Sequence, residues 1–327
     1  MQRFRNIFGS STRGVAIALC LFGLASTCCS QQTWPSKPIR LVVGFPAGGS
    51  VDTIARNAAQ QISVATGQPA YVENRPGAGG NLAASEVKRA APDGYTILVT
   101  STSVVTANPS LFKSSVGFAD LEQVSTIAKG AMYLVVRPGF NATNFNGLIA
   151  FAKSNPGALT YGSPGVGTPN HLATELMKMK AGFQATHVPY KGGPPALQDL
   201  MSGQIDFVLD PGLSLPYIQA GKLKLLGVMS SSRSPFFPQA PTLREQGFQG
   251  ANVDMWFGVF MPKGTPLAVQ TRLAEILKSF DQPRSREALA SLGIEPAVVS
   301  GPEFKRLLIN ETQLFSGLIR DLGITVD

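Results

Sequence analysis

Cysteine, histidine and charged residues are scarce in this 327-residue sequence. The three cysteines, Cys20, Cys28 and Cys29, lie in the first 29 residues, so we expect no cysteine-ligated zinc and no catalytic cysteine in the rest of the chain. The two histidines, His171 and His187, are too few for a multi-histidine metal site. Charged residues make up 15% of the chain, against about 25% in an average soluble protein. We therefore expect neither a metal nor a cofactor.

The remaining composition is typical of a globular protein. Hydrophobic residues account for 44% of the chain, and the length predicts roughly two domains. Glycine occupies 34 positions and proline 24, which directs the search for a site to the turns. The formal net charge is +8, and because the basic residues form no cluster we expect no nucleic-acid partner.

The first 30 residues have the pattern of a secretory signal peptide. Three arginines and no acid precede the apolar run 15–24, and small residues follow it up to Ser30. The run is too short to span a bilayer comfortably, which takes about 20 residues. Cleavage after Ser30 would leave 25 basic and 20 acidic residues, a net charge of +5. We expect a periplasmic protein; an uncleaved anchor and lipid attachment at Cys28 are the alternatives.

Short apolar segments, glycine-rich turns and amphipathic segments alternate along the rest of the chain. This order predicts an α/β fold with parallel βαβ units, and its restart near residue 132 predicts two lobes. Ligands of open parallel sheets bind beyond the carboxyl ends of the strands. The expected strands are 39–45, 70–73, 96–100, 132–137, 159–162, 186–190, 206–210, 223–228 and 257–260, and the expected helices are 52–65, 81–91, 145–154, 169–181, 195–202, 267–280 and 302–322.

A first glycine loop joins the first strand to the first helix. Its two adjacent glycines let backbone N–H groups approach a ligand, and we expect Ser50 to cap a helix whose N-terminus favours an anion. Asp52 should pair with Arg56 four residues on. An ordinary capped turn is the alternative, and the spacing fits neither a dinucleotide fingerprint nor a P-loop. The candidate ligand-binding residues here are Phe45, Pro46, Ala47, Gly48, Gly49, Ser50 and Asp52.

A second glycine loop precedes the helix 169–181. Thr168 is expected as its N-cap and Pro169 as its first residue, and Val166, Gly167 and Thr168 are the candidate ligand contacts. The two helix starts could face each other and hold two carboxylates; a well-made cap is again the alternative. A third loop, 74–81, is expected to be a structural turn, with orientation of the first loop or contact with the ligand as the two alternative roles.

Single polar residues near strand ends complete the candidates. Ser101 directly follows the third strand and is included in the binding site. Asp210 could bind a ligand amine or a bridging water, or cap the following turn. It lies about 13 Å along the strand from Asp206, too far for the carboxylate pair of a glycosidase. Lys191 is interpreted as a solvated lysine.

A catalytic serine is the main competing interpretation. Ser163 stands in a Tyr-Gly-Ser-Pro-Gly segment, which lacks the first glycine of the G-x-S-x-G elbow. We expect His171 and His187 to be structural, and no nucleophile–base pair within hydrogen-bond reach is apparent.

Several linked motifs recur in order along nearly all of the chain after the leader. They lie at residues 38–52, 73–80, 92–95, 165–171, 187–192, 196–200, 241–243 and 256–258. Together they resemble one family, the Bug substrate-binding proteins of tripartite tricarboxylate transporters in bacterial periplasms. One departure from the family pattern is Ala47, where many members have proline.

The resemblance implies a two-lobed Venus-flytrap of the type II periplasmic binding protein class. It also implies that loop 45–52 holds a small carboxylate and that 166–168 meets its far end. We therefore expect a monomeric, non-enzymatic receptor that delivers a di- or tricarboxylate, amino acid or aromatic acid to a transporter. A sensory receptor for a histidine kinase, or a hydrolase using the same site, is the alternative. Residues 34–131 with 251–327 are expected to form lobe 1 and residues 132–250 lobe 2.

Overall fold

The computed structural model describes residues 34–325, apart from residues 231, 251–252 and 291. The leader expected at residues 1–30, with its cleavage site and Cys28, lies outside the described residues. The chain divides into two compact units, Met1–Ser36 and Lys37–Asp327, and the following account concerns the second unit.

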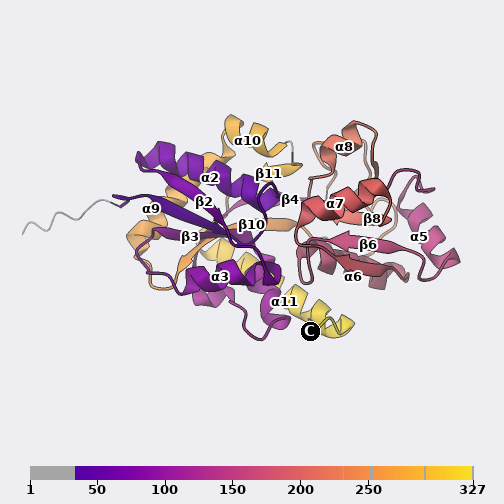
Figure 1. The fold of residues 1–327 in the computed structure, drawn as a ribbon, viewed down its shortest axis with the longest axis horizontal. Helices are drawn as coiled ribbons and strands as arrows, with labels where there is room; N and C mark the ends of the chain where they lie inside the picture. The colour runs from indigo at the N-terminus through magenta and orange to yellow at the C-terminus, as the bar shows by residue number, and fades with distance from the viewer. Residues whose placement is uncertain (1–33, 231, 251–252, 291, 326–327) are drawn as a thin grey trace, which may run out of the picture. The chain divides into compact units, whose positions relative to one another are not determined.

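A six-stranded mixed sheet forms one half of this unit, in the order β11-β4-β10-β3-β1-β2 (Figure 1). β1 pairs in parallel with β2 and β3, as the strand–helix alternation predicts, whereas β10 runs antiparallel to β3 and β4. We call this half the first lobe. Its strands are β1 (Ile39–Val43), β2 (Ala70–Asn74), β3 (Thr96–Ser101), β4 (Leu121–Gly130), β10 (Met255–Pro262) and β11 (Ile294–Pro296).

A five-stranded sheet, in the order β7-β6-β8-β5-β9, forms the other half, which we call the second lobe. β6 pairs in parallel with β7 and β8, and β5 runs antiparallel to β8 and β9. The chain passes from the first sheet to the second after β4 and returns before β10. The strands are β5 (Met132–Val136), β6 (Thr160–Ser163), β7 (Thr186–Pro189), β8 (Phe207–Asp210) and β9 (Lys224–Met229).

Helices cover the sheets, as in a mixed α/β protein. α2 buries the apolar face expected from the sequence, formed by Ile54, Ala55, Ala58, Ala59 and Ile62. The longer helices are α2 (Ser50–Thr66), α3 (Asn81–Lys88), α5 (Phe145–Ser154), α6 (Pro169–Ala181), α7 (Gly193–Ser202), α9 (Leu267–Leu277), α10 (Pro283–Ala290) and α11 (Gly301–Leu322), and the short ones are η1 (Ala78–Gly80), α4 (Ser103–Thr106), η2 (Asn108–Ser110), η3 (Phe118–Asp120), α8 (Leu215–Gln219) and η4 (Lys278–Asp281).

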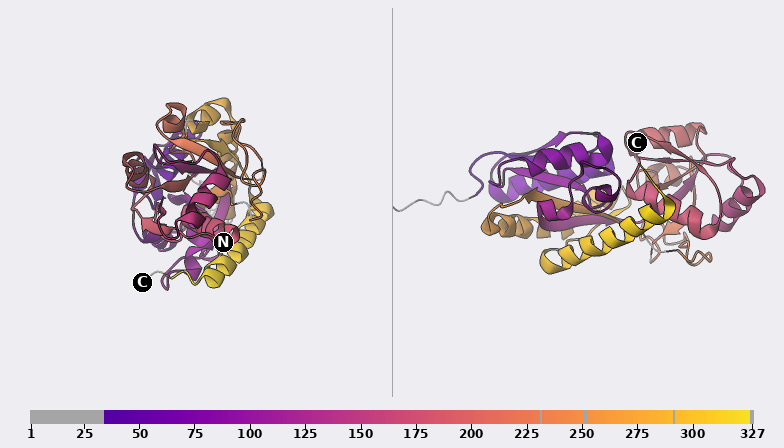
Figure 2. Two further views of the ribbon diagram at one scale, coloured as in Figure 1. Left: turned by 90° about the vertical axis from the view of Figure 1, so that its right-hand side faces the viewer. Right: turned by 90° about the horizontal axis from the view of Figure 1, so that it is seen from below.

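The last helix, α11, connects the two lobes. It packs against α4 and β4 of the first lobe and against α6 of the second, and Figure 2 shows it in yellow running along both. Its buried side chains recur at helical spacing, including Phe304, Leu308, Phe315 and Ile319.

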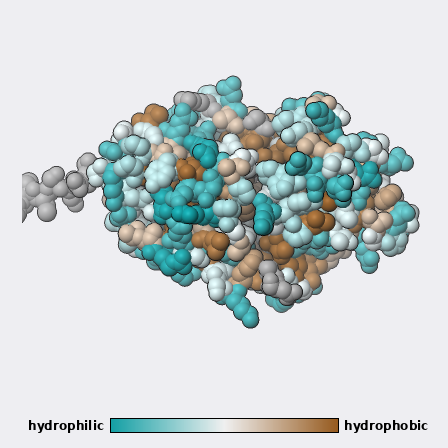
Figure 3. All heavy atoms as spheres, in the orientation of Figure 1, coloured by the Kyte–Doolittle hydropathy of each residue, from teal (hydrophilic) through white to brown (hydrophobic). Residues whose placement is uncertain are grey.

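Each lobe has its own apolar core. One buried cluster gathers around Val42, Leu98 and Phe260 in the first lobe, and another around Val135, Leu200 and Val208 in the second. On the surface, Figure 3 shows apolar residues in separate areas among hydrophilic ones. Within the described residues, no helix is long and apolar enough to cross a membrane.

Candidate ligand-binding site

A narrow void lies where the N-termini of α2 and α6 meet, between the two lobes. Its volume is about 40 Å³, which exceeds the roughly 10–15 Å³ that one ordered water needs. Both helix starts predicted to face each other contribute to it. The lining consists of Phe45, Pro46, Gly49, Ser50, Val51, Pro164, Thr168, Pro169, Asn170, Gly192, Gly193, Pro194, Asp210, Pro211, Leu213 and Met255.

The start of α2 presents donors to this void. Gly49, not Ser50 as predicted, is the N-cap, because the Gly49 carbonyl already accepts the Thr53 N–H at 3.0 Å. Ser50 becomes the first helical residue, and its hydroxyl is buried without a hydrogen-bond partner among the described residues. The N–H groups of Ser50 and Val51 belong to the first turn and have no acceptor within the helix. Hydroxyl, N–H groups and helix dipole together favour an anion here.

Asp52 braces this loop and does not line the void. Its carboxylate accepts hydrogen bonds from the Gly48 N–H at 3.0 Å, from Arg56 at 2.9 Å and from Asn74 at 2.9 Å. Burial alone would raise the pKa of Asp52, but these hydrogen bonds outweigh it and hold the pKa below its usual value. The expected ion pair between Asp52 and Arg56 is therefore present. Hydrogen bonds from Gly48 and Asn74 also fix the position of the Asp52 carboxylate.

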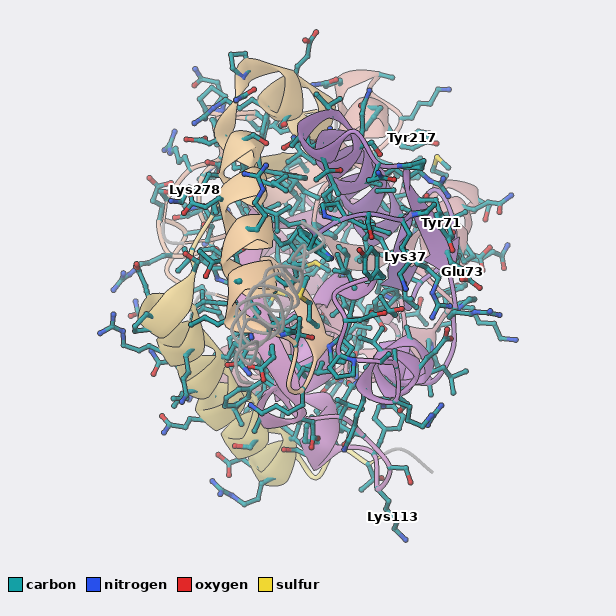
Figure 4. The ribbon with its side chains drawn as sticks, turned by 90° about the vertical axis from the view of Figure 1, so that its left-hand side faces the viewer. Lys37, Tyr71, Glu73, Lys113, Tyr217 and Lys278 are labelled. Atoms are coloured by element: carbon teal, nitrogen blue, oxygen red, sulfur yellow. The ribbon has the colours of Figure 1, made fainter. Side chains whose placement is uncertain are left out.

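The third loop forms hydrogen bonds that hold the first loop in position. The Asn74 side chain donates to the Phe45 carbonyl at 3.0 Å, and the Arg75 N–H donates to the Val43 carbonyl at 2.7 Å. Next to it, Arg40 binds Glu73 at 3.0 Å; Figure 4 shows Glu73 beside Tyr71 on β2, an edge strand. Of the two roles expected for this loop, the contacts favour orientation.

The backbone at the start of α6 agrees with the prediction, whereas the expected side-chain cap is not formed. Thr168 is the N-cap and Pro169 the first helical residue, but the Thr168 hydroxyl donates to the Gly165 carbonyl at 2.7 Å and does not cap the helix. The Gly167 N–H donates to Nδ1 of His171 at 3.2 Å, so it is not free for a ligand. The N–H of Asn170 lies in the first turn and has no acceptor within the helix.

Behind this loop, Ser163 and His187 form a hydrogen bond that the sequence did not reveal. Ser163 Oγ lies 2.7 Å from Nε2 of His187, so the expectation that no nucleophile–base pair is present is wrong. The His187 and His171 rings stack with centroids 4.1 Å apart. Burial lowers the pKa of His171 to about 4 and that of His187 to about 3, so both rings are neutral near pH 7. Ser163 is 1% exposed, and no carboxylate hydrogen-bonds His187 among the described residues.

Asp210 and Asn170 belong to the second-lobe wall of the void. Oδ2 of Asp210 accepts from the Gly212 N–H at 2.9 Å, and from the Ser214 N–H at 2.8 Å and hydroxyl at 2.7 Å. Asp210 thus caps the turn that follows it while also lining the void. Burial raises the pKa of Asp210, and these three hydrogen bonds oppose the rise. The Asn170 amide nitrogen donates to the Leu209 carbonyl at 2.7 Å, and its oxygen is buried without a partner among the described residues.

The structure brings half of the candidate residues to the void. Phe45, Pro46, Gly49, Ser50, Thr168 and Asp210 line it, whereas Ala47, Gly48, Asp52, Ser101, Val166 and Gly167 do not. Ser101 is fully buried, with its hydroxyl 3.0 Å from that of Ser103. Lys191 is exposed, as interpreted.

Several lining residues were missed at the sequence level. Asn170 directly follows the predicted N-cap and proline, and Gly192 follows the end of β7, so the strand-end rule could have found both. Met255 begins the returning strand β10, and no local pattern indicates that it reaches the void.

Known proteins of similar sequence identify the family of this chain. Residues 54–324 match the family described as "Tripartite tricarboxylate transporter family receptor". The chain is also 33% identical to "Protein BugT" of Bordetella pertussis over 315 residues, covering 94% of this chain and 96% of that protein.

Solved structures show the same two-lobed fold. A Rhodopseudomonas palustris protein determined with adipate has 32% identity and a TM-score of 0.85, over 90% of this chain and all of that one. A second protein from that organism, MatC with bound malate, has 31% identity and a TM-score of 0.80, over 88% of this chain and all of that one. The Venus-flytrap expected from the sequence is therefore confirmed, and the chain belongs to the Bug-type receptor family of tripartite tricarboxylate transporters.

Proposed function

We propose that this protein is an exported receptor that binds a small carboxylate between its two lobes. The observation that carries the proposal lies at the start of α2, where the buried hydroxyl of Ser50 has no hydrogen-bond partner among the described residues. Beside it, the N–H groups of Ser50 and Val51 have no acceptor within the helix, and both residues line the void. Two relatives of similar fold were determined with the carboxylates adipate and malate, which supports an acid as ligand.

Binding would proceed in two stages. The carboxylate docks on the first lobe at Gly49, Ser50 and Val51, and the second lobe then closes over it. Closure is a shift between two populated states, driven by contacts that the ligand makes only in the closed one. We propose lobe limits of about 34–131 with 251–327, and 132–250, so that the two crossings between the sheets act as the hinge.

The function of the closed form is delivery to membrane transporter subunits, with a sensor kinase as the alternative partner. Export to the periplasm follows from the basic, apolar and small-residue pattern of residues 1–30. Fractionation of the host cell should find the mature protein in the periplasmic fraction, and retention in the cytoplasm would contradict export.

Thermal denaturation with a library of small carboxylates tests the binding function. Ligand that binds only the folded state raises the midpoint by mass action, equivalent to about 2.7 kcal/mol at 100 times Kd. At least one carboxylate should stabilise the protein, and native mass spectrometry should show a one-to-one complex. Stabilisation by none of them would refute the proposal.

A hydrolase is the second candidate, because Ser163 and His187 are within hydrogen-bond distance. An active serine needs access to substrate and a base oriented by a third group. Ser163 is buried, and no carboxylate of the described residues hydrogen-bonds His187. We expect the purified protein to hydrolyse p-nitrophenyl esters no faster than its Ser163→Ala variant; a large loss of hydrolysis in that variant would establish the enzyme.

A further inference from the structure

On the second lobe, two buried side chains that line the void, those of Asn170 and Asp210, have acceptor oxygens. Asn170 is 3% exposed, and no described residue forms a hydrogen bond with its Oδ1. The amide orientation is fixed, because the nitrogen donates to the Leu209 carbonyl and a flipped amide would place two acceptors together. Asp210, 6% exposed, uses Oδ2 for its three hydrogen bonds, and no hydrogen bond to its Oδ1 is seen among the described residues.

In the described part of the chain, no positive side chain pairs with this buried carboxylate. Among the described residues, the lining of the void contains no lysine or arginine, and no ion pair is made by Asp210. Lys191, the nearest lysine in sequence to the lining glycines, is exposed. Burying a carboxylate without a counter-charge costs free energy. The three hydrogen bonds that Asp210 accepts all go to the same oxygen, Oδ2.

The two lobes therefore offer different side-chain groups to the void. The start of α2 provides a hydroxyl and N–H donors, whereas the side chains of Asn170 and Asp210 provide acceptors. Apolar side chains, including Phe45, Leu213 and Met255, also line the void. A second carboxylate beside Asp210 would bring two acids together, but an ammonium group could donate to both Asn170 and Asp210.

We propose that Asn170 and Asp210 form a subsite for the ammonium group of an aminocarboxylate, so that the ligand is a zwitterion bound at both ends. This inference rests on the proposed receptor function, since it assumes that the carboxylate end docks on α2. The alternative occupant of the subsite is a buried water: a smaller void of about 10 Å³, also lined by Asn170 and Asp210, adjoins the first.

Calorimetric titration of the full mature chain with matched acids separates these cases. The set comprises butanoate, succinate, 4-hydroxybutanoate, 4-aminobutanoate and 2-aminobutanoate, with the five- and six-carbon counterparts of each. In at least one chain length, an amino acid should bind about 10- to 100-fold more tightly than the dicarboxylate and the unsubstituted acid, the range expected for one charge-assisted hydrogen bond. The hydroxy acid, a neutral donor, should fall between them.

The variant Asp210→Asn tests the residue itself. Its carbonyl oxygen can still accept from Gly212 and Ser214, while its amide nitrogen places a donor where an acceptor stood. We expect it to lose the preference for the amino acid and to gain affinity for the matched dicarboxylate. Asp206→Asn, just before the same strand and bonded to Arg137 and Thr160 away from the void, is the control and should keep the wild-type preference.

The outcomes separate the two proposals. Binding of no acid in the set or in the wider carboxylate library would refute the receptor function. Binding of dicarboxylates as tightly as their amino counterparts by the wild-type protein would overturn the ammonium subsite alone and favour the water. Because that ratio is measured on the wild-type protein, it decides the question even if Asp210→Asn does not fold.

Discussion

The Gly167 N–H donates a hydrogen bond of 3.2 Å to Nδ1 of His171, one turn into α6. This bond requires an unprotonated Nδ1, so it fixes the tautomer of His171 and excludes the imidazolium. His187 stacks on the same ring and lies 2.7 Å from Ser163, whose hydroxyl also contacts the Gly165 carbonyl at 3.0 Å. The two neutral histidines therefore stabilise the loop between β6 and α6 through hydrogen bonds to Ser163 and Gly167.

The histidine pair predicts an acid-sensitive fold. Burial lowers the pKa of His171 from 6.5 to about 4, so between these values the unfolded chain takes up a proton that the folded one does not. The free energy of unfolding should therefore decrease as the pH falls from about 6.5 to 4, by on the order of 3 kcal/mol for this residue. Chemical denaturation at a series of pH values measures the slope.

The variant His171→Leu removes this titration. Its unfolding free energy should depend less on pH between 6.5 and 4 than that of the wild-type protein, whatever its absolute stability. An unchanged slope would show that His171 is protonated in the folded protein.

Glu311 on α11 predicts the opposite pH dependence. Burial raises its pKa to about 8, although Thr102 and Thr106 donate to it at 2.9 and 3.3 Å. The folded protein then keeps a proton that the unfolded chain loses above about pH 4.5, so this group lowers stability as the pH rises toward 8. Glu311→Gln should unfold at a higher denaturant concentration than the wild-type protein at pH 8.5, with a smaller difference at pH 5.

The exposed Glu303, on the same helix, provides the control. Glu303→Gln should change the midpoint little at either pH, because an exposed carboxylate has similar surroundings in both states. If Glu311→Gln is less stable than the wild-type protein at both pH values, the carboxylate is ionised in the fold and stabilised by its threonine partners.

The sequence predicted the elements that local signals determine. The apolar face of α2 and the Thr168-Pro169 start of α6 follow from spacing and capping, and both are confirmed. β4 was missed because its ten residues mix polar and apolar side chains; it is a strand because β10 and β11 pair with it from elsewhere in the chain.

Long-range contacts explain the remaining differences in the site. The Ser163–His187 bond joins residues 24 positions apart on neighbouring strands, and no spacing rule predicts such a pair. Likewise, Ser50 looks like an N-cap in the sequence, but the N-cap is Gly49 and Ser50 is already the first helical residue. The resulting unpartnered hydroxyl is evident only in three dimensions.

Ser50→Ala tests the anion end of the void. No described residue forms a hydrogen bond with this hydroxyl, so its removal should leave the unfolding free energy unchanged or slightly higher. Loss of one hydrogen bond to a carboxylate should weaken binding of the best acid about 10-fold or more. Titration and thermal denaturation measure the two effects.

Ser154→Ala, at the exposed end of α5, is the control and should change neither the affinity nor the stability. Equal affinity of Ser50→Ala and the wild-type protein would exclude Ser50 from the site.

Gly167→Ala tests how the second loop fits against the first lobe. Gly167 has a φ of +79°, and a Cβ there would lie 2.3 Å from Leu111 Cδ1 and 3.3 Å from Asn108 Oδ1. Gly182 has a similar φ of +66° with nothing within 4 Å, so Gly182→Ala should cost only the backbone strain, about 1 kcal/mol of unfolding free energy. We expect Gly167→Ala to lower the free energy of unfolding further and to weaken carboxylate binding, because Leu111 must move for the loop to keep its place.

Adding Leu111→Ala to Gly167→Ala should restore part of the carboxylate binding. Equal binding by Gly182→Ala and Gly167→Ala would show that the contact between Gly167 and Leu111 does not support the site.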